Sequence, residues 1–188
     1  MSSAADTRTC SDRDASIPIA RSRAPNQETE PMPVKPIPDG YSSVTPYLAV
    51  KQAADAIEFY RRAFGAKERM RLVAPDGKVG HAELAIGDSV IMLADEHPDI
   101  DFRSPESYGG ASVTLHLYVP DVDASFRKAT EAGAKPLRQV QDQFYGDRSG
   151  TVRDPFGHVW NIATHKEDLS SEEIARRAAA AFKKQGKA

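Results

Sequence analysis

VTPYLAV (44–50) and VTLHLYV (113–119) are two versions of one segment, 69 residues apart in the chain. Both alternate apolar residues with polar or small ones, which is typical of β-strands. An amphipathic stretch follows each segment and ends in Gly-Ala-Lys, at 65–67 and again at 133–135. The glycines stand where a helix C-terminus favours a left-handed residue. Each segment is therefore expected to be a strand that leads into a helix.

The repeat continues to the end of both halves, since SVIMLA (89–94) aligns with HVWNIA (158–163) at the same offset of 69 residues. Further extended segments separated by turn residues lie between helix and last strand in each half, at 68–74 and 79–86 and then at roughly 136–142 and 149–153. Self-similarity at so long a period indicates a duplicated supersecondary unit. The sequence predicts an α+β fold of two βαβββ modules, at about 41–95 and 111–165, that form a cupped mixed sheet.

Two tails flank the predicted paired domain at 39–165. Residues 1–38 are rich in proline and polar residues, which predicts a disordered tail, and the one cysteine, Cys10, lies in it as an incidental thiol. Residues 166–188 are predicted to carry a C-terminal helix, because Ser170 and Glu173 have capping-box spacing ahead of an alanine-rich run.

Composition excludes several classes of protein. The 188 residues carry 25 basic and 27 acidic side chains, a formal charge of −2, which argues against a nucleic-acid partner. A single cysteine excludes a disulfide framework and a multi-thiolate zinc site. No apolar run approaches the roughly 18 residues of a membrane span, and no secretory signal is visible. We therefore expect a soluble cytoplasmic protein with no membrane partner.

The predicted strands have one apolar face and one polar face. In five of the predicted strands, the polar face contains no lysine or arginine. Its residues there are Thr45, Tyr47, Ala49, His81, Glu83, Ala85, Val90, Met92, Ala94, Thr114, His116, Tyr118, Val159, Asn161 and Ala163. A half-solvated face normally collects lysine and arginine, so this mixture favours the inside of a ligand cup. A simply solvated sheet face is the alternative.

The paired modules resemble the vicinal oxygen chelate superfamily, which includes glyoxalase I, extradiol dioxygenases, and fosfomycin- and bleomycin-resistance proteins. The stretches AIEFYRRAFGA (56–66), HAELAIGDSVIMLAD (81–95) and DQFYGDRSGTVRDPFGHVWNIATH (142–165) are similar to its PhnB-like branch. The resemblance implies a homodimer whose clefts are lined by both chains and bind a small molecule.

The superfamily's enzymes hold a divalent metal on the first and last strand of each module. The resemblance carries those positions to Thr45, Met92, Thr114 and Asn161. Hydroxyls, a thioether and an amide are poor ligands for the metals of this superfamily, so no metal and no other cofactor is expected. A relocated metal site at His81, Glu83 and His116 is the alternative, if these side chains converge.

Two functions remain open. The first is a metal-free, antibiotic-type binding protein that resembles bleomycin-resistance proteins; the acidic domain, with 14 basic and 18 acidic side chains at 39–165, suits a cationic guest. The second is a glyoxalase-like lyase or isomerase, rather than a dioxygenase, that uses Glu83 and His116 as catalytic groups. The predicted ligand-binding residues are Thr45, Tyr47, His81, Met92, Thr114, Tyr118, Phe144, Tyr145 and Asn161.

Overall fold

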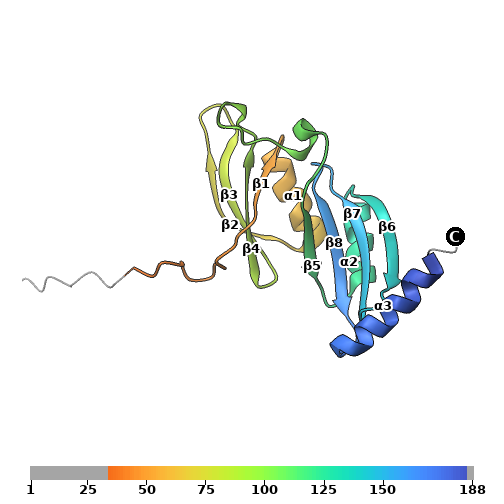
Figure 1. The fold of residues 1–188 in the computed structure, drawn as a ribbon. Helices are drawn as coiled ribbons and strands as arrows, with labels where there is room; N and C mark the ends of the chain where they lie inside the picture. The colour runs from red at the N-terminus through yellow and green to blue at the C-terminus, as the bar shows by residue number, and fades with distance from the viewer. Residues whose placement is uncertain (1–33, 186–188) are drawn as a thin grey trace, which may run out of the picture. The chain divides into compact units, whose positions relative to one another are not determined.

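The computed structural model describes residues 34–185 of the chain, so Cys10 and most of the predicted N-terminal tail lie outside the described residues. The order of elements is β-α-β-β-β, twice, followed by one helix (Figure 1). The first module consists of β1 (Tyr47–Val50), α1 (Ala53–Phe64), β2 (Lys67–Val73), β3 (Val79–Ile86) and β4 (Ser89–Asp95). The second consists of β5 (Thr114–Tyr118), α2 (Val122–Glu131), β6 (Lys135–Asp142), β7 (Asp147–Arg153) and β8 (Val159–His165), and α3 (Ser171–Gln185) follows it. The predicted pair of βαβββ modules is confirmed.

Each module forms its own four-stranded mixed sheet. The strand orders are β1-β4-β3-β2 and β5-β8-β7-β6, and only the first strand of each module pairs in parallel. Helix α1 packs on β1, β3 and β4, whereas α2 packs on β6, β7 and β8, and the two helices also contact each other. Each sheet therefore has one face covered by helices and one open face, and the open faces lie on opposite sides of the helical layer.

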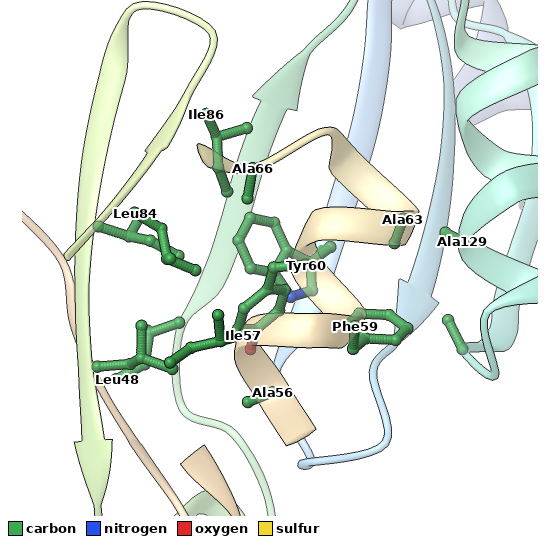
Figure 2. Packing of buried hydrophobic residues seen from close by; sticks show 14 of the residues in the cluster. Leu48, Ala56, Ile57, Phe59, Tyr60, Ala63, Ala66, Leu84, Ile86 and Ala129 are labelled. Carbon is green, nitrogen blue, oxygen red and sulfur yellow. The ribbon is translucent and has the colours of Figure 1, made fainter. Parts of the chain in front are cut away.

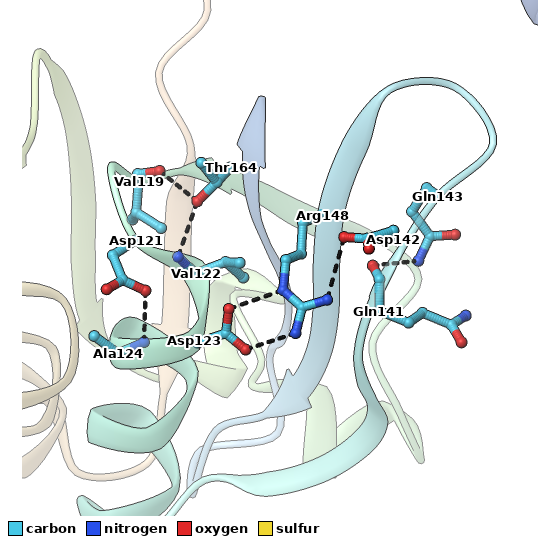
Figure 3. Close-up of polar contacts among 10 residues, drawn as sticks. All are labelled: Val119, Asp121, Val122, Asp123, Ala124, Gln141, Asp142, Gln143, Arg148 and Thr164. Atoms are coloured by element: carbon cyan, nitrogen blue, oxygen red, sulfur yellow. Dashed lines mark hydrogen bonds and ion pairs between the residues drawn. The ribbon is translucent and has the colours of Figure 1, made fainter. Parts of the chain in front are cut away.

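The last strand of each module fixes the start of that module's helix. In the first module the carboxylate of Asp95 accepts hydrogen bonds from the backbone N–H groups of Ala53, at 3.0 Å, and Val79, at 2.8 Å. In the second module Thr164 stands at the equivalent position and accepts from the N–H of Val122 at 2.8 Å (Figure 3). The N–H groups of Ala53 and Val122 lie in the first turn of a helix and have no partner inside it, so these two contacts join strand and helix. The duplication thus extends to the capping residue.

An arginine ties α2 to the β6–β7 hairpin. Arg148 donates to both carboxylate oxygens of Asp123, at 2.8 and 2.9 Å, and to Asp142 at 3.2 Å (Figure 3). The paired carboxylates raise the pKa of the Arg148 guanidinium. This side of the second module is held by a bidentate ion pair.

The buried core runs without a break from one module to the other. Ile57, Phe59 and Tyr60 of α1 are its centre, with Leu48 and Leu84 of the first sheet on one side (Figure 2). Tyr60 also packs against Trp160 of β8, with ring centroids 5.4 Å apart. The helical layer is therefore shared, and the open faces are the parts of the sheets that it does not cover.

Polar bonds reinforce this contact between the modules. Asp154, which precedes β8 and is 4% exposed, accepts from Tyr60 Oη at 2.8 Å and from Trp160 Nε1 at 2.9 Å. Its other oxygen accepts from two backbone N–H groups of its own turn, those of Phe156 and His158, at 2.9 Å each. One buried carboxylate thus links α1 of the first module to the turn and last strand of the second.

The segments outside the modules carry the remaining helices. Two 3-10 helices, η1 (Pro98–Ile100) and η2 (Pro105–Tyr108), lie on the connection between the modules. Helix α3 begins as predicted, since Ser170 Oγ accepts from the N–H of Glu173 at 3.2 Å. No helix within residues 34–185 is long and apolar enough to span a membrane.

Candidate functional site

Each open face carries one row of four side chains across its sheet. Cross-strand partners point to the same side of a sheet, so the strand register defines both rows. In the first module the row is Tyr47, Met92, Glu83 and Met70. In the second it is His116, Asn161, Thr151 and Arg138. The rows are equivalent positions of the duplicated unit, with Tyr47 matching His116 and Met70 matching Arg138.

The register bears on the positions carried over from the superfamily's metal site. Thr45 and Thr114 were given as its first-strand positions, and the residues beside Met92 and Asn161 are Tyr47 and His116. Thr45 precedes β1, and its hydroxyl donates to the carbonyl of Ser42 at 3.1 Å. Thr114 begins β5, one pleat before His116, and lines the same hollow as that histidine. Tyr47 and His116 are equivalent positions of the repeat, two residues beyond Thr45 and Thr114 in each half.

The register also bears on charge. The residues that the sequence placed on the polar face include no lysine or arginine, and Arg138 joins them in the row of the second module. It belongs to β6, whose residues were not assigned to a face. Its neighbour Leu137 is 48% exposed, and β6 as a whole lacks clear alternation of apolar and polar residues. No periodic signal could therefore have placed Arg138 on the cup face.

A chain of hydrogen bonds crosses the open face of the first module. Glu83, 7% exposed, accepts from the hydroxyl of Tyr41, and its other oxygen lies 3.4 Å from His81 Nε2. His81 Nδ1 in turn lies 2.8 Å from Tyr47 Oη. The hydrogen bond from Tyr41 is the main cause that lowers the pKa of Glu83, so the carboxylate is ionised at neutral pH. Three predicted residues, Tyr47, His81 and Glu83, are thus brought together.

Tyr41 is a site residue that the sequence did not reveal. It lies ahead of β1, outside any regular element, so no periodicity places it on the sheet. The guanidinium of Arg69, on β2, lies 4.7 Å from the centroid of its ring. Bonding to Glu83 raises the pKa of Tyr41, so its phenol stays a donor. The segment before β1 therefore contributes to the open face.

The second module has its own network. Asn161, 8% exposed, lies 3.0 Å from His116 Nδ1 through its amide nitrogen. Its amide oxygen accepts from Thr151 Oγ1 at 3.1 Å and from the Arg138 guanidinium at 3.4 Å. The four residues of the row are therefore bonded to one another from edge to edge. They line, with Thr114 and Leu137, an open hollow of about 510 Å³.

The remaining predicted aromatics lie at the end of β5 and on the β6–β7 turn. The ring of Tyr118 lies 4.6 Å from that of His116, and its hydroxyl donates to Asp147 at 2.9 Å. Phe144 packs edge-on against Tyr145 at 5.2 Å and against Phe182 of α3 at 6.0 Å. Tyr118 thus extends the row of the second module, whereas Phe144 contacts the terminal helix.

A second hollow, of about 410 Å³, lies between the first strands of the two modules. Tyr47 and Leu48 form one wall, Val113 and Leu115 another, and Phe102 of the connecting segment covers it. Tyr47 packs against Phe102 with centroids 5.1 Å apart, so it borders both this hollow and the row of its own sheet.

The donor set does not fit a divalent metal within one chain. The first- and last-strand positions of the rows hold a phenol, a thioether, an imidazole and an amide, a poor set for zinc, nickel, manganese or iron. Among residues 34–185, no group of three or more His, Cys, Asp or Glu side chains is placed to hold a metal ion. His81 and Glu83 lie on the first sheet and His116 lies on the second, so these three do not converge inside one chain.

Comparison with known proteins gives one family. The model of the Glyoxalase/Bleomycin resistance protein/Dioxygenase superfamily matches residues 42–162. An uncharacterized protein of Mycobacterium tuberculosis is 41% identical over 155 residues, which cover 81% of this chain and 89% of that protein. The crystal structure of TioX from Micromonospora sp. ML1 is 28% identical, with a TM-score of 0.52, over 69% of this chain and all of that one. A PhnB protein from Bacillus cereus shares the fold at 18% identity, with a TM-score of 0.52, over 65% of this chain and 99% of that one.

Proposed function

Because this chain belongs to the Glyoxalase/Bleomycin resistance protein/Dioxygenase superfamily, we propose that it binds a small organic molecule, without a resident metal, in clefts of a homodimer. The observation that carries the proposal is the pair of rows on the open faces. The second row is polar and is bonded through its own members, whereas the first combines Tyr47 and Glu83, joined through His81, with two methionines. Neither presents a set of ligands suited to a divalent metal.

The dimer follows from where the open faces lie. A single four-stranded sheet cannot enclose a ligand, and the helical layer separates the two open faces of one chain. We infer that the enclosed cleft forms where the first module of one copy faces the second module of another. A twofold dimer forms two such clefts, each lined by both chains. Tyr47, His81 and Glu83 would then face His116, Tyr118 and Asn161 of the other copy.

Mixed dimers test this arrangement. Tyr47→Ala removes a side chain from the row of the first module, and His116→Ala removes one from the row of the second. A small-molecule fragment that binds the wild-type protein is expected to lose affinity for either variant alone. In a re-equilibrated equal mixture, about a quarter of the clefts combine two intact rows, so binding returns to about that fraction. No recovery, with both variants folded and dimeric, would show that each cleft belongs to one chain.

Elemental analysis tests independence from metal. Untagged protein is purified without chelator after supplementation with nickel, manganese, iron or zinc. We expect no metal to be retained near one atom per chain, and fragment binding to be unchanged by a chelator. One metal per chain that is lost in His116→Ala or Glu83→Ala would refute the metal-free proposal.

A glyoxalase-like lyase or isomerase is a second candidate. The chain Tyr47–His81–Glu83–Tyr41 favours it, since an imidazole held between a phenol and a carboxylate can relay protons. The lowered pKa of Glu83 makes that carboxylate a weak base, so His81 is the better candidate for proton transfer. Turnover that is abolished by His81→Ala, while fragment affinity is kept, would favour this candidate over passive binding.

A further inference from the structure

We propose that the open face of the second module binds an oxyanion, a carboxylate or phosphate group of the bound molecule, at Arg138 and His116. The inference rests on the proposed function, because it names the chemistry of a group held in the same cleft. Both side chains lie in one row with Asn161 and Thr151, and the four line one open hollow. The direction of the hydrogen bonds among them carries the inference.

The amide of Asn161 has one possible orientation. Arg138 has only N–H donors, so the atom that faces its guanidinium at 3.4 Å must be the amide oxygen. The amide nitrogen then faces His116 Nδ1 at 3.0 Å and donates to it. His116 Nδ1 is thereby the acceptor, and the neutral imidazole carries its hydrogen on Nε2. With Asn161 only 8% exposed, water cannot easily replace these bonds.

The acceptors of this cluster are already engaged. The oxygen of Asn161 accepts from Thr151 and Arg138, and Thr151 Oγ1 accepts from Arg138 at 3.2 Å. The hydroxyl of Thr114, which also lines the hollow, can donate or accept. The groups of the row that remain for a ligand are the other guanidinium N–H groups and the Nε2–H of His116, which are donors. A ligand group that satisfies them must be an acceptor.

The charge of Arg138 is also available. Arg148, on the neighbouring strand, is neutralised by Asp123 and Asp142, whereas Arg138 forms no ion pair with any carboxylate of residues 34–185. A guanidinium binds planar oxyanions through two parallel hydrogen bonds, which are stronger than bonds between neutral groups. The cluster therefore suits a carboxylate or phosphate and disfavours an ammonium group.

The first module lacks this arrangement, so the two sides of the proposed cleft differ in chemistry. The position equivalent to Arg138 is Met70, and the position equivalent to Thr151 is Glu83, a carboxylate that would repel an anion. In a cleft built from one module of each kind, the oxyanion would lie against the second module. The remainder of the ligand would then face Tyr47, Met70 and Met92.

Nuclear magnetic resonance titration of the full-length protein tests the proposal. Sodium phosphate, sodium acetate and neutral acetamide are added separately at constant ionic strength, and the side-chain signals of Asn161, His116 and Arg138 are followed. We expect saturable shifts with phosphate, with acetate or with both, which identifies the oxyanion, and none with acetamide. Arg138→Gln is expected to weaken the affinity about 10-fold or more, since it removes a charge-assisted hydrogen bond.

Arg127→Gln is the matched control, because it removes the same charge from an exposed site on α2, away from the open face. Its affinity for the anion is expected to stay within about twofold of wild type. Equal losses of anion affinity in both variants, or no saturable shift with either anion, would refute the proposed oxyanion site. Arg138→Gln that dissociates the dimer and leaves anion affinity unchanged would also refute it, since Arg138 would then pair with a carboxylate across the interface.

A fragment screen on the same protein separates this inference from the proposed function. If neutral or cationic fragments shift the signals of the row residues and both anions do not, the proposed cleft stands and the proposed oxyanion site is refuted. No fragment and no anion affecting either row would count against the binding function itself.

Discussion

Tyr60→Phe is the substitution that best isolates the link between the modules. It removes one hydroxyl from a fully buried ring and leaves no cavity, so packing in the aromatic layer is unchanged. Burial, and then the carboxylate of Asp154, raise the pKa of Tyr60 well above its usual value, so the phenol is a donor at any working pH. A hydrogen bond to a buried charged group contributes about 1.5–3 kcal/mol, and the substitution should lower the free energy of unfolding by that amount.

Asp154→Ala should cost more, because it leaves several donors unpaired. The hydroxyl of Tyr60 and the Nε1–H of Trp160 lose their acceptor inside the core, and two backbone N–H groups of the turn lose theirs. Removing one side of a buried charged network costs about 3–5 kcal/mol. We therefore expect Asp154→Ala to lower the free energy of unfolding more than Tyr60→Phe does.

Urea unfolding at fixed protein concentration measures both, followed by the fluorescence of Trp160, the chain's one tryptophan. Tyr108→Phe is the control, since that hydroxyl bonds to Asp101 on an exposed segment, and its loss should cost less than about 0.5 kcal/mol. A Tyr60→Phe protein no less stable than Tyr108→Phe would refute the reasoning. So would an Asp154→Ala protein destabilised by less than about 1 kcal/mol.

Three further substitutions test other parts of the structure. Gly150→Ala should destabilise the protein by about 1–3 kcal/mol, since its Cβ would lie 2.8 Å from a core ring atom, whereas Gly80→Ala meets nothing closer than 3.9 Å and should be tolerated; urea midpoints compare them. Asp95→Ala should cost about 1–2 kcal/mol by leaving two backbone N–H groups unpaired, and thermal unfolding measures it. His165 bonds to Asp147 and then to Asp168, which raise its pKa, so its stabilising effect is present below pH about 6.5 and is lost as pH rises through the raised value. His165→Asn should therefore destabilise more at pH 5.5 than at pH 8.5, and a pH-independent difference between the two proteins would contradict this.

The duplication made the fold accessible from sequence. Two copies of one pattern allow a weak element to be identified by its stronger counterpart, as α2 was by α1. The site was harder, because a strand's register depends on hydrogen bonds with a partner that is remote in sequence. A shift of two residues keeps every side chain on its face, so alternation cannot detect it. That is why Thr45 was expected at the place that Tyr47 occupies.

Residues outside clear patterns were missed for a related reason. Tyr41 precedes any strand, and its contact with Glu83 depends on the path of an irregular segment. Arg138 lies on an exposed edge strand, where both faces tolerate polar residues and alternation weakens. Both positions are set by tertiary contacts, which local propensity does not encode.

Net charge and the contacts within the proposed cleft favour different ligands. An acidic domain favoured a cationic guest, because the summed charge of a protein controls the field at long range. Within a cleft, however, affinity depends on which donors and acceptors are still free at contact distance. Here Glu83, in the row of the first module, is held by Tyr41 and His81, whereas the guanidinium of Arg138, in the row of the second, is held only by neutral oxygens. The ligand preference of a binding site is therefore better judged from the donors and acceptors that have no partner inside the protein. In the row of the second module, those groups on Arg138 and His116 are donors.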